Sequence, residues 1–394
     1  MKKNHLLILI ILIISNLNAQ YNHCTNARLK QVVFSDTTMK DVQYGAALNN
    51  NGVMQDLYMT VIEPKNDTAA LRPVAIMAFG GAFINGQRSD LNAFCKTFAQ
   101  SGYTAITIDY RIGYPLRFDS LDVTVKGFKK AAFRGAQDMR AALQFLYKSA
   151  RNGNPYHIDT NYIISGGGSS GAILSMFNAY YKPNLLSVED SDIMNSIGGI
   201  NGNTSNAGYP HDVFGLINVV GALNDTNFLQ SGDVPIASCH GTNDNTVPYG
   251  TGYPYNINVL PVSHGSSIIK IRANNVGIPN TLHTTPGAGH TNIDYVGCIF
   301  NILDFYHGLI CNYTSSVAEV VQNSTRLYPN PVENLLNIEL EDNIQSVQIF
   351  TVDGKFINTY HQKSIDLSNY KSGIYFIEIT NSKGQIIRKK IVKA

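Results

Sequence analysis

The sequence predicts a mostly parallel α/β sheet with helices on both faces, followed by a small all-β sandwich. Strand-like apolar runs alternate with helix-like stretches over residues 28–312, and this alternation is typical of a parallel sheet covered on both faces. After residue 313 the pattern changes to short alternating segments separated by turn residues. The 394 residues are enough for two domains with cores of their own.

The N-terminus predicts export. Lys2 and Lys3 precede an almost unbroken apolar run over residues 6–14, and a small residue, Ala19, follows. This is the order of parts in a secretory signal peptide, which we predict at residues 1–19. The apolar run is too short to span a bilayer comfortably, and no later stretch predicts a transmembrane anchor. Lys and Arg number 30 against 28 Asp and Glu, so no net field favours a nucleic-acid partner.

Five cysteines in an exported chain allow two disulfides and one leftover thiol. Cys24 and Cys311 lie near the two ends of the first predicted domain, and chain ends often lie close together. A Cys24–Cys311 bridge is therefore one candidate, and Cys298–Cys311 is its rival. We expect Cys239, at the end of a strand-like run, to be a buried free thiol. No Cys or His spacing predicts a zinc site, and we expect no metal or organic cofactor.

The order of elements along the first domain follows from apolar runs and turn residues. Residues 30–62 read as antiparallel entry strands, with a hairpin turn at residues 49–52. The stretch 127–150 carries apolar residues at helical spacing. We expect strands at residues 73–79, 104–109, 162–165, 213–220 and 235–240, and helices at residues 91–101, 127–150, 172–180 and 295–308.

A glycine-framed serine follows the third of these strands. Residues 162–171 read YIISGGGSSG, which contains G-x-S-x-G with Ser169 at its centre, and a helix-compatible segment begins directly afterwards. Strand, sharp turn and helix form the context of a nucleophile elbow. The turn is strained, so Gly167 and Gly171 meet the need for neighbours without side chains. The motif indicates acyl transfer through Ser169, with Ser170 as the neighbouring rival.

A serine nucleophile needs a histidine base and an acid that orients it. Asp244 lies beyond the carboxyl end of the strand at residues 235–240, where catalytic groups of open α/β sheets collect. His290 lies on the small-residue loop PGAGH before the last helix. The chain order Ser169, Asp244, His290 is the order of α/β-hydrolases. Other acids and histidines are expected to be structural: Asp225, Asp233, His240, His264 and His283.

The fourth requirement is an oxyanion hole. Small residues in AFGGAF, at residues 78–83, allow backbone N–H groups to approach a developing oxyanion closely. We expect Gly81 and Ala82 to donate, with Gly80 as the fallback, together with the amide of Ser170. The long loops at residues 201–210 and 248–262 are rich in Gly, Asn and Tyr. Among their aromatic residues we single out Tyr249 as a substrate contact, with its neighbours Tyr253 and Tyr255.

Residues 28–312 resemble an α/β-hydrolase of the esterase/lipase group. FGGAF is similar to that group's HGGGF motif, D-Y-R at residues 109–111 to its D-Y-R segment, and HGTNDNTVPY and GAGH to its acid and histidine loops. Phe79 replaces the usual histidine, and Ala82 the last glycine. The resemblance implies a serine carboxylic-ester hydrolase acting on an ester substrate, such as acylated polysaccharide or short-chain esters. A serine peptidase of the same fold and a non-catalytic binding protein on this scaffold are the alternatives.

The C-terminal segment resembles the sorting domain of type IX secretion. LYPNPV at residues 327–332, KSGIYF at residues 371–376 and the basic end at residues 388–390 carry the resemblance. It implies export across the outer membrane by the type IX machinery, to the cell surface or beyond. We therefore expect a signal peptide, a hydrolase domain, a linker and a β-sandwich, in this order: residues 1–19, 24–313, 314–325 and 326–394.

Overall fold

The computed structural model describes most of the chain in two compact units that divide after Cys311. The described residues are 24, 27–116, 120–202, 206–258, 260–318, 326–340, 342–351, 355–382 and 386–394. The predicted signal peptide lies outside them. The last helix of the first unit, α7 (Tyr295–Ala318), extends into the segment predicted as the linker.

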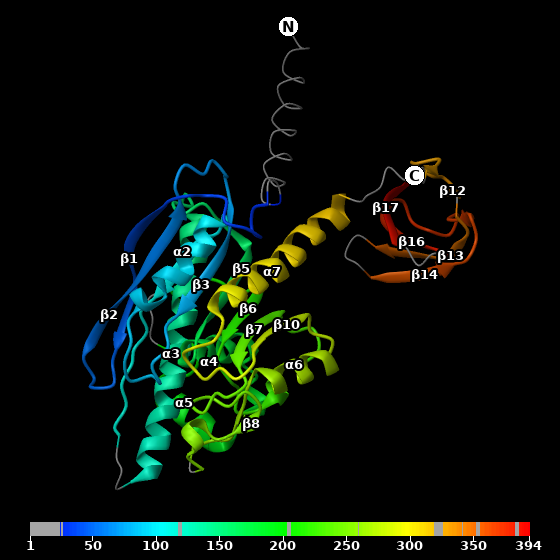
Figure 1. The fold of residues 1–394 in the computed structure, drawn as a ribbon. Coiled ribbons are helices and arrows are strands. Elements are labelled where there is room, and N and C mark those ends of the chain that lie inside the picture. Colours follow the sequence, from blue (N-terminus) through cyan, green and yellow to red (C-terminus); the bar gives the residue numbers. More distant parts are fainter. Residues whose placement is uncertain are drawn as a thin grey trace. The chain divides into compact units, whose positions relative to one another are not determined.

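The first unit is built on an eight-stranded sheet within the described residues (Figure 1). Its spatial order is β1 (Thr37–Leu48), β2 (Met54–Pro64), β4 (Thr104–Ile108), β3 (Arg72–Ala78), β5 (Ile158–Gly168), β6 (Gly215–Val219), β7 (Ile236–Gly241) and β10 (Asn280–Thr285). The pairs β1–β2 and β2–β4 are antiparallel, and the others are parallel. The predicted α/β class with a mostly parallel sheet is confirmed.

Helices cover both faces of this sheet because the buried strands are apolar on both sides. On one face, Ala75 and Met77 of β3 belong to the same core as α2 (Asn92–Gln100) and α7. On the other face, Val74 and Ile76 pack with α3 (Leu121–Arg151). The remaining helices are α4 (Ser170–Tyr180), α5 (Val188–Asn195) and α6 (Ser266–Asn275). The sequence pattern did not predict the edge strand β10, whose residues are all half-buried and mostly polar.

A buried ion pair connects the segment after β4 to helix α3. The Arg111 backbone N–H donates to Asp138 Oδ2 at 2.7 Å, and its guanidinium lies 2.8 Å from Asp138 Oδ1. The Asp138 side chain is fully buried, so the charge pairing is what makes it tolerable there. The pair fixes the D-Y-R segment, and with it Tyr110, next to the serine turn.

The second unit is a sandwich of two antiparallel sheets. One contains β11 (Arg326–Tyr328), β12 (Leu335–Glu339) and β15 (Ser364–Asp366); the other contains β14 (Phe356–Tyr360), β13 (Ile344–Thr351), β16 (Gly373–Asn381) and β17 (Ile386–Lys393). Their inward side chains form one aliphatic core that includes Leu336, Ile365, Val347 and Ile377. The predicted all-β sandwich is confirmed. The sequence pattern did not predict β11, β14 and β15 as separate strands, since they have only three to five residues.

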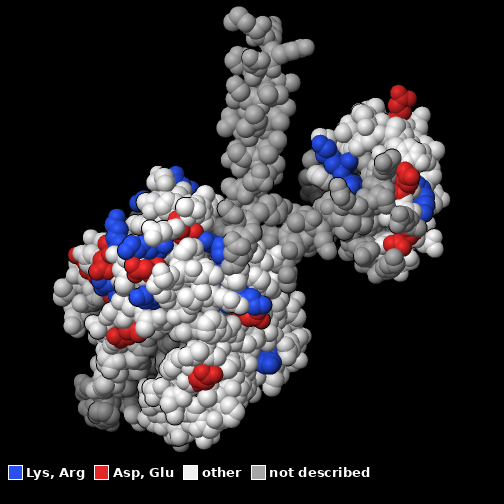
Figure 2. Space-filling model, turned by 45° about the horizontal axis from the view of Figure 1, so that its top comes forward, with Lys and Arg blue, Asp and Glu red and all other residues white. Residues whose placement is uncertain are grey.

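Charges of both signs lie next to one another on the first unit, and large areas of the same face carry none (Figure 2). Arg88, for example, pairs with both Asp41 and Asp109. This mixture is what the nearly balanced composition leads one to expect.

Candidate active site

Ser169 lies in the sharp turn between β5 and α4. Its backbone has φ 51° and ψ −119°, a region that non-glycine residues rarely occupy and that costs about 1–3 kcal/mol. The surrounding backbone fixes this conformation: Ser169 N–H donates to Val219 O at 2.8 Å, and Ser169 O accepts from Ile173 N–H at 3.0 Å. The strained turn is the geometry of a nucleophile elbow.

The glycines around Ser169 are required by close backbone approach. A Cβ on Gly171 would lie 2.0 Å from Ala78 O, and one on Gly167 would lie 2.3 Å from the same oxygen. A Cβ on Gly168 would meet nothing within 4 Å. The two framing glycines of G-x-S-x-G therefore let α4 and β5 pack against the end of β3.

The structure brings Ser169, His290 and Asp244 into one chain of hydrogen bonds. His290 Nε2 lies 3.0 Å from Ser169 Oγ, and His290 Nδ1 lies 2.6 Å from Asp244 Oδ2. With Asp244 ionised, Nδ1 carries the proton and donates a hydrogen bond to the carboxylate, which leaves Nε2 free to accept a hydrogen bond from the serine hydroxyl. The imidazole is thus oriented to take a proton from Ser169.

Asp244 is fully buried and surrounded by donors. Its Oδ1 accepts from the N–H groups of Thr246 at 2.8 Å and Val247 at 2.9 Å, and its Oδ2 also accepts from His240 Nε2 at 3.1 Å. Burial alone would raise the pKa of Asp244, but hydrogen bonds from His240, His290 and Val247 outweigh it and hold the pKa well below its usual range. The carboxylate therefore stays ionised beside His290.

His240 supports Asp244 rather than Ser169. Its ring is buried, and Nε2 donates to Asp244 Oδ2 and lies 3.0 Å from Val247 O. Nδ1 is then the acceptor for the Ser266 hydroxyl, at 2.8 Å. The structural role predicted for His240 near the Asp244 loop agrees with these contacts, whereas Ser266 carried no signal in the sequence.

The loop after β3 passes directly beside the serine. Gly81, Ala82 and Phe83 have φ values of 116°, 54° and 60°, which make a tight turn. A Cβ on Gly80 would lie 3.2 Å from Ser169 Cβ. Phe79, which replaces the histidine usual at this position, stacks on Tyr110 with ring centroids 4.3 Å apart.

The side chain of Ser170 points away from His290. Tyr110 OH donates to Phe79 O at 3.0 Å, so the contact of 3.2 Å between Tyr110 and Ser170 Oγ has the Ser170 hydroxyl as donor. Ser170 is buried. Of the two neighbouring serines, only Ser169 has its hydroxyl against the imidazole.

Two hollows meet at Ser169. We call the first the aromatic hollow, because Phe83, Phe128, Phe133 and Phe177 line it. We call the second the histidine hollow, because His290 lines it. The hollows share four residues: Ala82, Ser169, Thr246 and Tyr255.

Tyr249 does not line either hollow, so the structure does not support it as a substrate contact. Its hydroxyl lies 2.9 Å from Thr284 Oγ1, and its ring packs edge-on against His240. Tyr255, six residues further on, lines both hollows, and Tyr295 lines the histidine hollow. In the sequence, only the position of Tyr295 five residues after His290 indicates that Tyr295 lies near the site.

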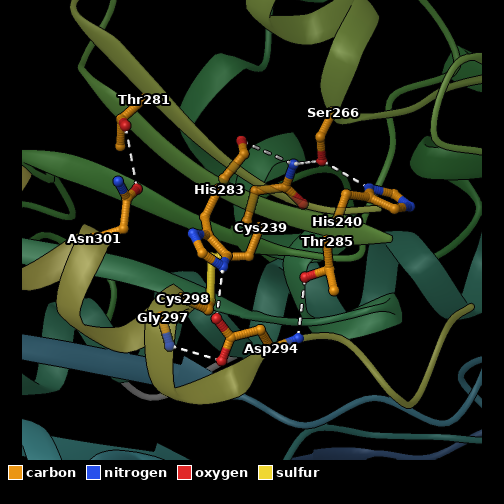
Figure 3. The surroundings of a disulfide bond; sticks show 12 residues. Cys239, His240, Ser266, Thr281, His283, Thr285, Asp294, Gly297, Cys298 and Asn301 are labelled. Carbon is orange, nitrogen blue, oxygen red and sulfur yellow. Dashed lines mark hydrogen bonds and ion pairs between the residues drawn. A yellow bond between two sulfur atoms is a disulfide. The ribbon is translucent and has the colours of Figure 1, made fainter. Parts of the chain in front are cut away.

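Two disulfides are present, and one of them, Cys239–Cys298, corrects a prediction (Figure 3 shows this bridge). Cys24 pairs with Cys311, which is one of the two pairings considered from the sequence. Cys239 pairs with Cys298, so the expectation of a free thiol at Cys239 is wrong. The free thiol is Cys95, which is buried, and burial raises its pKa. The sequence could not show that β7 and α7 lie side by side, which is what brings Cys239 to Cys298.

The described residues contain no group of three or more His, Cys, Asp and Glu side chains that could hold a metal ion. Among the same residues, no helix combines the length and the hydropathy needed to cross a bilayer.

Comparisons with known proteins agree with this architecture. Residues 56–220 match the BD-FAE family model, and residues 326–393 match the model of the secretion system C-terminal sorting domain. Among solved structures, the chain is similar to a truncated carbohydrate esterase from gut microbiota, with 18% identity and a TM-score of 0.51 over 71% of this chain and 98% of that chain. It is also similar to the thermophilic esterase Est2 of the Planctomycetes species Thermogutta terrifontis, with 18% identity and a TM-score of 0.48 over 69% of this chain and 92% of that chain. No curated protein matches.

The first unit is thus an α/β-hydrolase domain of the esterase-like kind. The second unit is a type IX sorting domain, which indicates export by that secretion machinery to the cell surface or the medium. The resemblance to an esterase-type α/β-hydrolase and the resemblance to a sorting domain, both noted in the sequence, are confirmed.

Proposed function

We propose that the first unit hydrolyses carboxylic esters through an acyl-enzyme, with Ser169 as the nucleophile, His290 as the base and Asp244 as the orienting acid. The observation that carries the proposal is the chain of hydrogen bonds from Ser169 Oγ through the His290 imidazole to Asp244 Oδ2, with distances of 3.0 and 2.6 Å. A nucleophile, a base and an orienting acid within hydrogen-bond reach are the parts that acyl transfer needs.

The reaction proceeds in two halves. Ser169 Oγ attacks the ester carbonyl carbon while His290 Nε2 takes the hydroxyl proton, which gives a tetrahedral intermediate. Collapse of this intermediate breaks the bond to the alcohol oxygen, and the imidazolium gives its proton to the leaving alcohol. Water then attacks the acyl-enzyme with His290 again as base, and the acid leaves as Ser169 regains its proton. Asp244 stabilises the imidazolium in both halves.

The oxyanion is held by backbone amides of Gly81, Ala82 and Ser170. Ser170 is the first residue of α4, and the first amides of a helix have no acceptor inside it. The positive φ values at Gly81 and Ala82 form a turn beside Ser169. Such fixed donors contribute most where charge develops in the transition state.

The two hollows take different parts of the ester substrate. His290 must protonate the leaving alcohol, and it lines only the histidine hollow, so the alcohol lies there. The acyl group then extends into the aromatic hollow. Short-chain esters and acyl groups on polysaccharide are the substrates we propose. The carbohydrate esterase among the structural neighbours shares the fold, and fold alone does not fix the substrate.

Turnover of p-nitrophenyl acetate and butyrate tests the reaction. Wild type should hydrolyse both esters, and Ser169→Ala should lower kcat/KM by about 1000-fold or more. Ser170→Ala is the matched control: it removes the contact with Tyr110 but keeps the backbone amide, and it should retain at least about a tenth of the activity. No turnover by wild type, or equal activity in Ser169→Ala, would rule out the proposal.

Export should involve cleavage near both ends of the chain. We propose that residues 1–19 are removed as a signal peptide and that the sorting domain is cleaved near residues 314–325. Intact-mass measurement of the secreted protein tests both statements. A mature form that keeps residues 326–394 contradicts removal of the sorting domain without affecting the ester-hydrolase proposal.

A further inference from the structure

The buried Cys239–Cys298 disulfide joins β7 to the start of α7 (Figure 3). Cys239 is in β7, directly before His240, and Asp244 lies five residues after Cys239. Cys298 is in the first turn of α7, eight residues after His290. Both cysteines are fully buried. The crosslink thus joins the strand that leads into the acid loop to the helix that follows the histidine loop.

The start of α7 is also attached to β10, the strand that leads into the histidine loop. Asp294 N–H donates to Thr285 Oγ1 at 3.0 Å, which closes the loop between these two residues. His283 Nε2 lies 3.2 Å from Asp294 Oδ2, and the Asp294 Oδ1 accepts from Gly297 N–H at 2.9 Å. The position of α7 therefore sets where the histidine loop ends (Figure 3).

Besides the Asp244–His290 hydrogen bond, a few contacts of the backbone join the two loops. Asn243 N–H donates to Ala288 O at 2.9 Å, and Thr242 N–H donates to Thr285 O at 3.2 Å. A Cβ on Gly241 would lie 2.3 Å from Ala288 O, so the backbones are already as close as glycine allows. Each hydrogen bond contributes only modestly to stability, and Gly287 N–H, which donates to Thr242 Oγ1, is exposed to solvent.

The short Asp244–His290 contact depends on this spacing. The oxygen and nitrogen are 2.6 Å apart, and a misplacement of about 1 Å in a catalytic group costs on the order of 100-fold in rate. If α7 moved away from β7, the end of the histidine loop would move with it, and His290 would lose its alignment with Asp244 or with Ser169.

We infer that Cys239 and Cys298 are positioning residues for the proposed hydrolysis, because their disulfide holds the Asp244 loop and the His290 loop in register. This inference rests on the proposed function. It assigns the crosslink a role in kcat beyond the stabilisation that any disulfide provides by constraining the unfolded chain.

The second disulfide provides the comparison. Cys311 lies thirteen residues beyond Cys298 in α7, about 20 Å along the helix axis, and it joins the helix to Cys24. This crosslink closes the longer loop, 287 residues against 59, so it should contribute at least as much to stability. It does not join the two catalytic loops.

Two double variants, Cys239→Ala with Cys298→Ala and Cys24→Ala with Cys311→Ala, separate positioning from stability. Kinetics with p-nitrophenyl butyrate are measured well below the melting temperature of each variant, which circular dichroism gives. Loss of Cys239–Cys298 should lower kcat by about 10- to 100-fold with KM changed by less than about threefold. Loss of Cys24–Cys311 should lower the melting temperature but leave kcat within about twofold of wild type.

Cys239→Val with Cys298→Ala is a second variant that refills the space left by the sulfur atoms, and it should show the same loss of kcat. A wild-type kcat in either folded variant overturns the inference, as does an equal loss of kcat in the Cys24 and Cys311 variant. Failure of both Cys239 variants to fold also overturns it, because the crosslink would then serve folding. None of these results alters the proposed function, which stands or falls on wild type and Ser169→Ala.

Discussion

The two sides of the proposed active site are held in place in different ways. The Ser169 turn is fixed by backbone packing between β5, α4 and the end of β3, with no room for a Cβ at Gly167 or Gly171. The Asp244–His290 side is assembled from loops after β7 and β10, through side-chain hydrogen bonds and the disulfide. The serine turn should therefore tolerate no added volume at Gly167 or Gly171. When side chains on the acid–base side change, the fold should remain but the catalytic groups should lose their alignment.

Gly171→Ala should have the largest effect, on the serine side. The new Cβ would lie 2.0 Å from Ala78 O and 2.5 Å from Phe79 O, both backbone atoms, so β3 and α4 must separate. We expect a loss of stability above about 3 kcal/mol and no measurable esterase activity. Urea unfolding and ester turnover check this.

Gly168→Ala is the matched control for the serine side, because its Cβ would meet nothing within 4 Å. Its free energy of unfolding should stay within about 1 kcal/mol of wild type. Equal stability of the Gly171 and Gly168 variants would contradict the view that close backbone approach fixes the turn.

Asp244→Asn should have the next largest effect, on the acid–base side. The amide can still accept from Thr246 and Val247 N–H, so the loop should fold. Its NH₂ group would favour the wrong tautomer of His290 and would not stabilise the imidazolium. We expect kcat to fall by about 10³- to 10⁴-fold, measured with p-nitrophenyl butyrate.

Asp225→Asn is the control for this acid, since Asp225 caps a short 3-10 helix by accepting from Asn227 N–H. Its kcat should match wild type. A loss below about tenfold for Asp244→Asn would show that another group orients His290.

Ser266→Ala should have the smallest effect. It removes the donor to His240 Nδ1, and the unpaired nitrogen costs about 1–3 kcal/mol in a buried position. Since His240 acts on Asp244 and not on substrate, we expect kcat to fall by about tenfold with little change in KM. Ser267→Ala, next to it on α6, removes a bond to Tyr249 O instead and should leave kcat within about twofold; equal losses would argue against a specific role for His240.

The same difference between the two sides explains what the sequence could predict. The serine turn was predictable because its requirements are local: a strand, two glycines four positions apart, and a helix, all within residues 158–180. Asp244 and His290 were predictable from chain order and from their small-residue loops after strands. The orienting contacts of His240 and Ser266 were not fully predictable, because they depend on how α6 packs against β7.

Long-range pairings were the least predictable features. Cys239 reads as the end of a buried strand, and only the packing of α7 on β7 reveals Cys298 as its partner. Tyr249 and Tyr255 lie in the same loop, but of the two only Tyr255 lines the hollows. Its positive φ of 55° belongs to a turn of this loop. The edge strand β10 has no continuous apolar run, because an edge position leaves its side chains half-buried.

The most direct test of the central claim is covalent labelling with a fluorophosphonate, which reacts with a serine activated by a neighbouring base. Intact-mass and peptide mass spectrometry of wild type should show one adduct per chain, located on Ser169. The adduct should be absent from Ser169→Ala and present in Ser170→Ala, whose hydroxyl donates to Tyr110 in the wild type. An adduct on Ser170, or equal labelling of Ser169→Ala and wild type, would contradict Ser169 as the nucleophile.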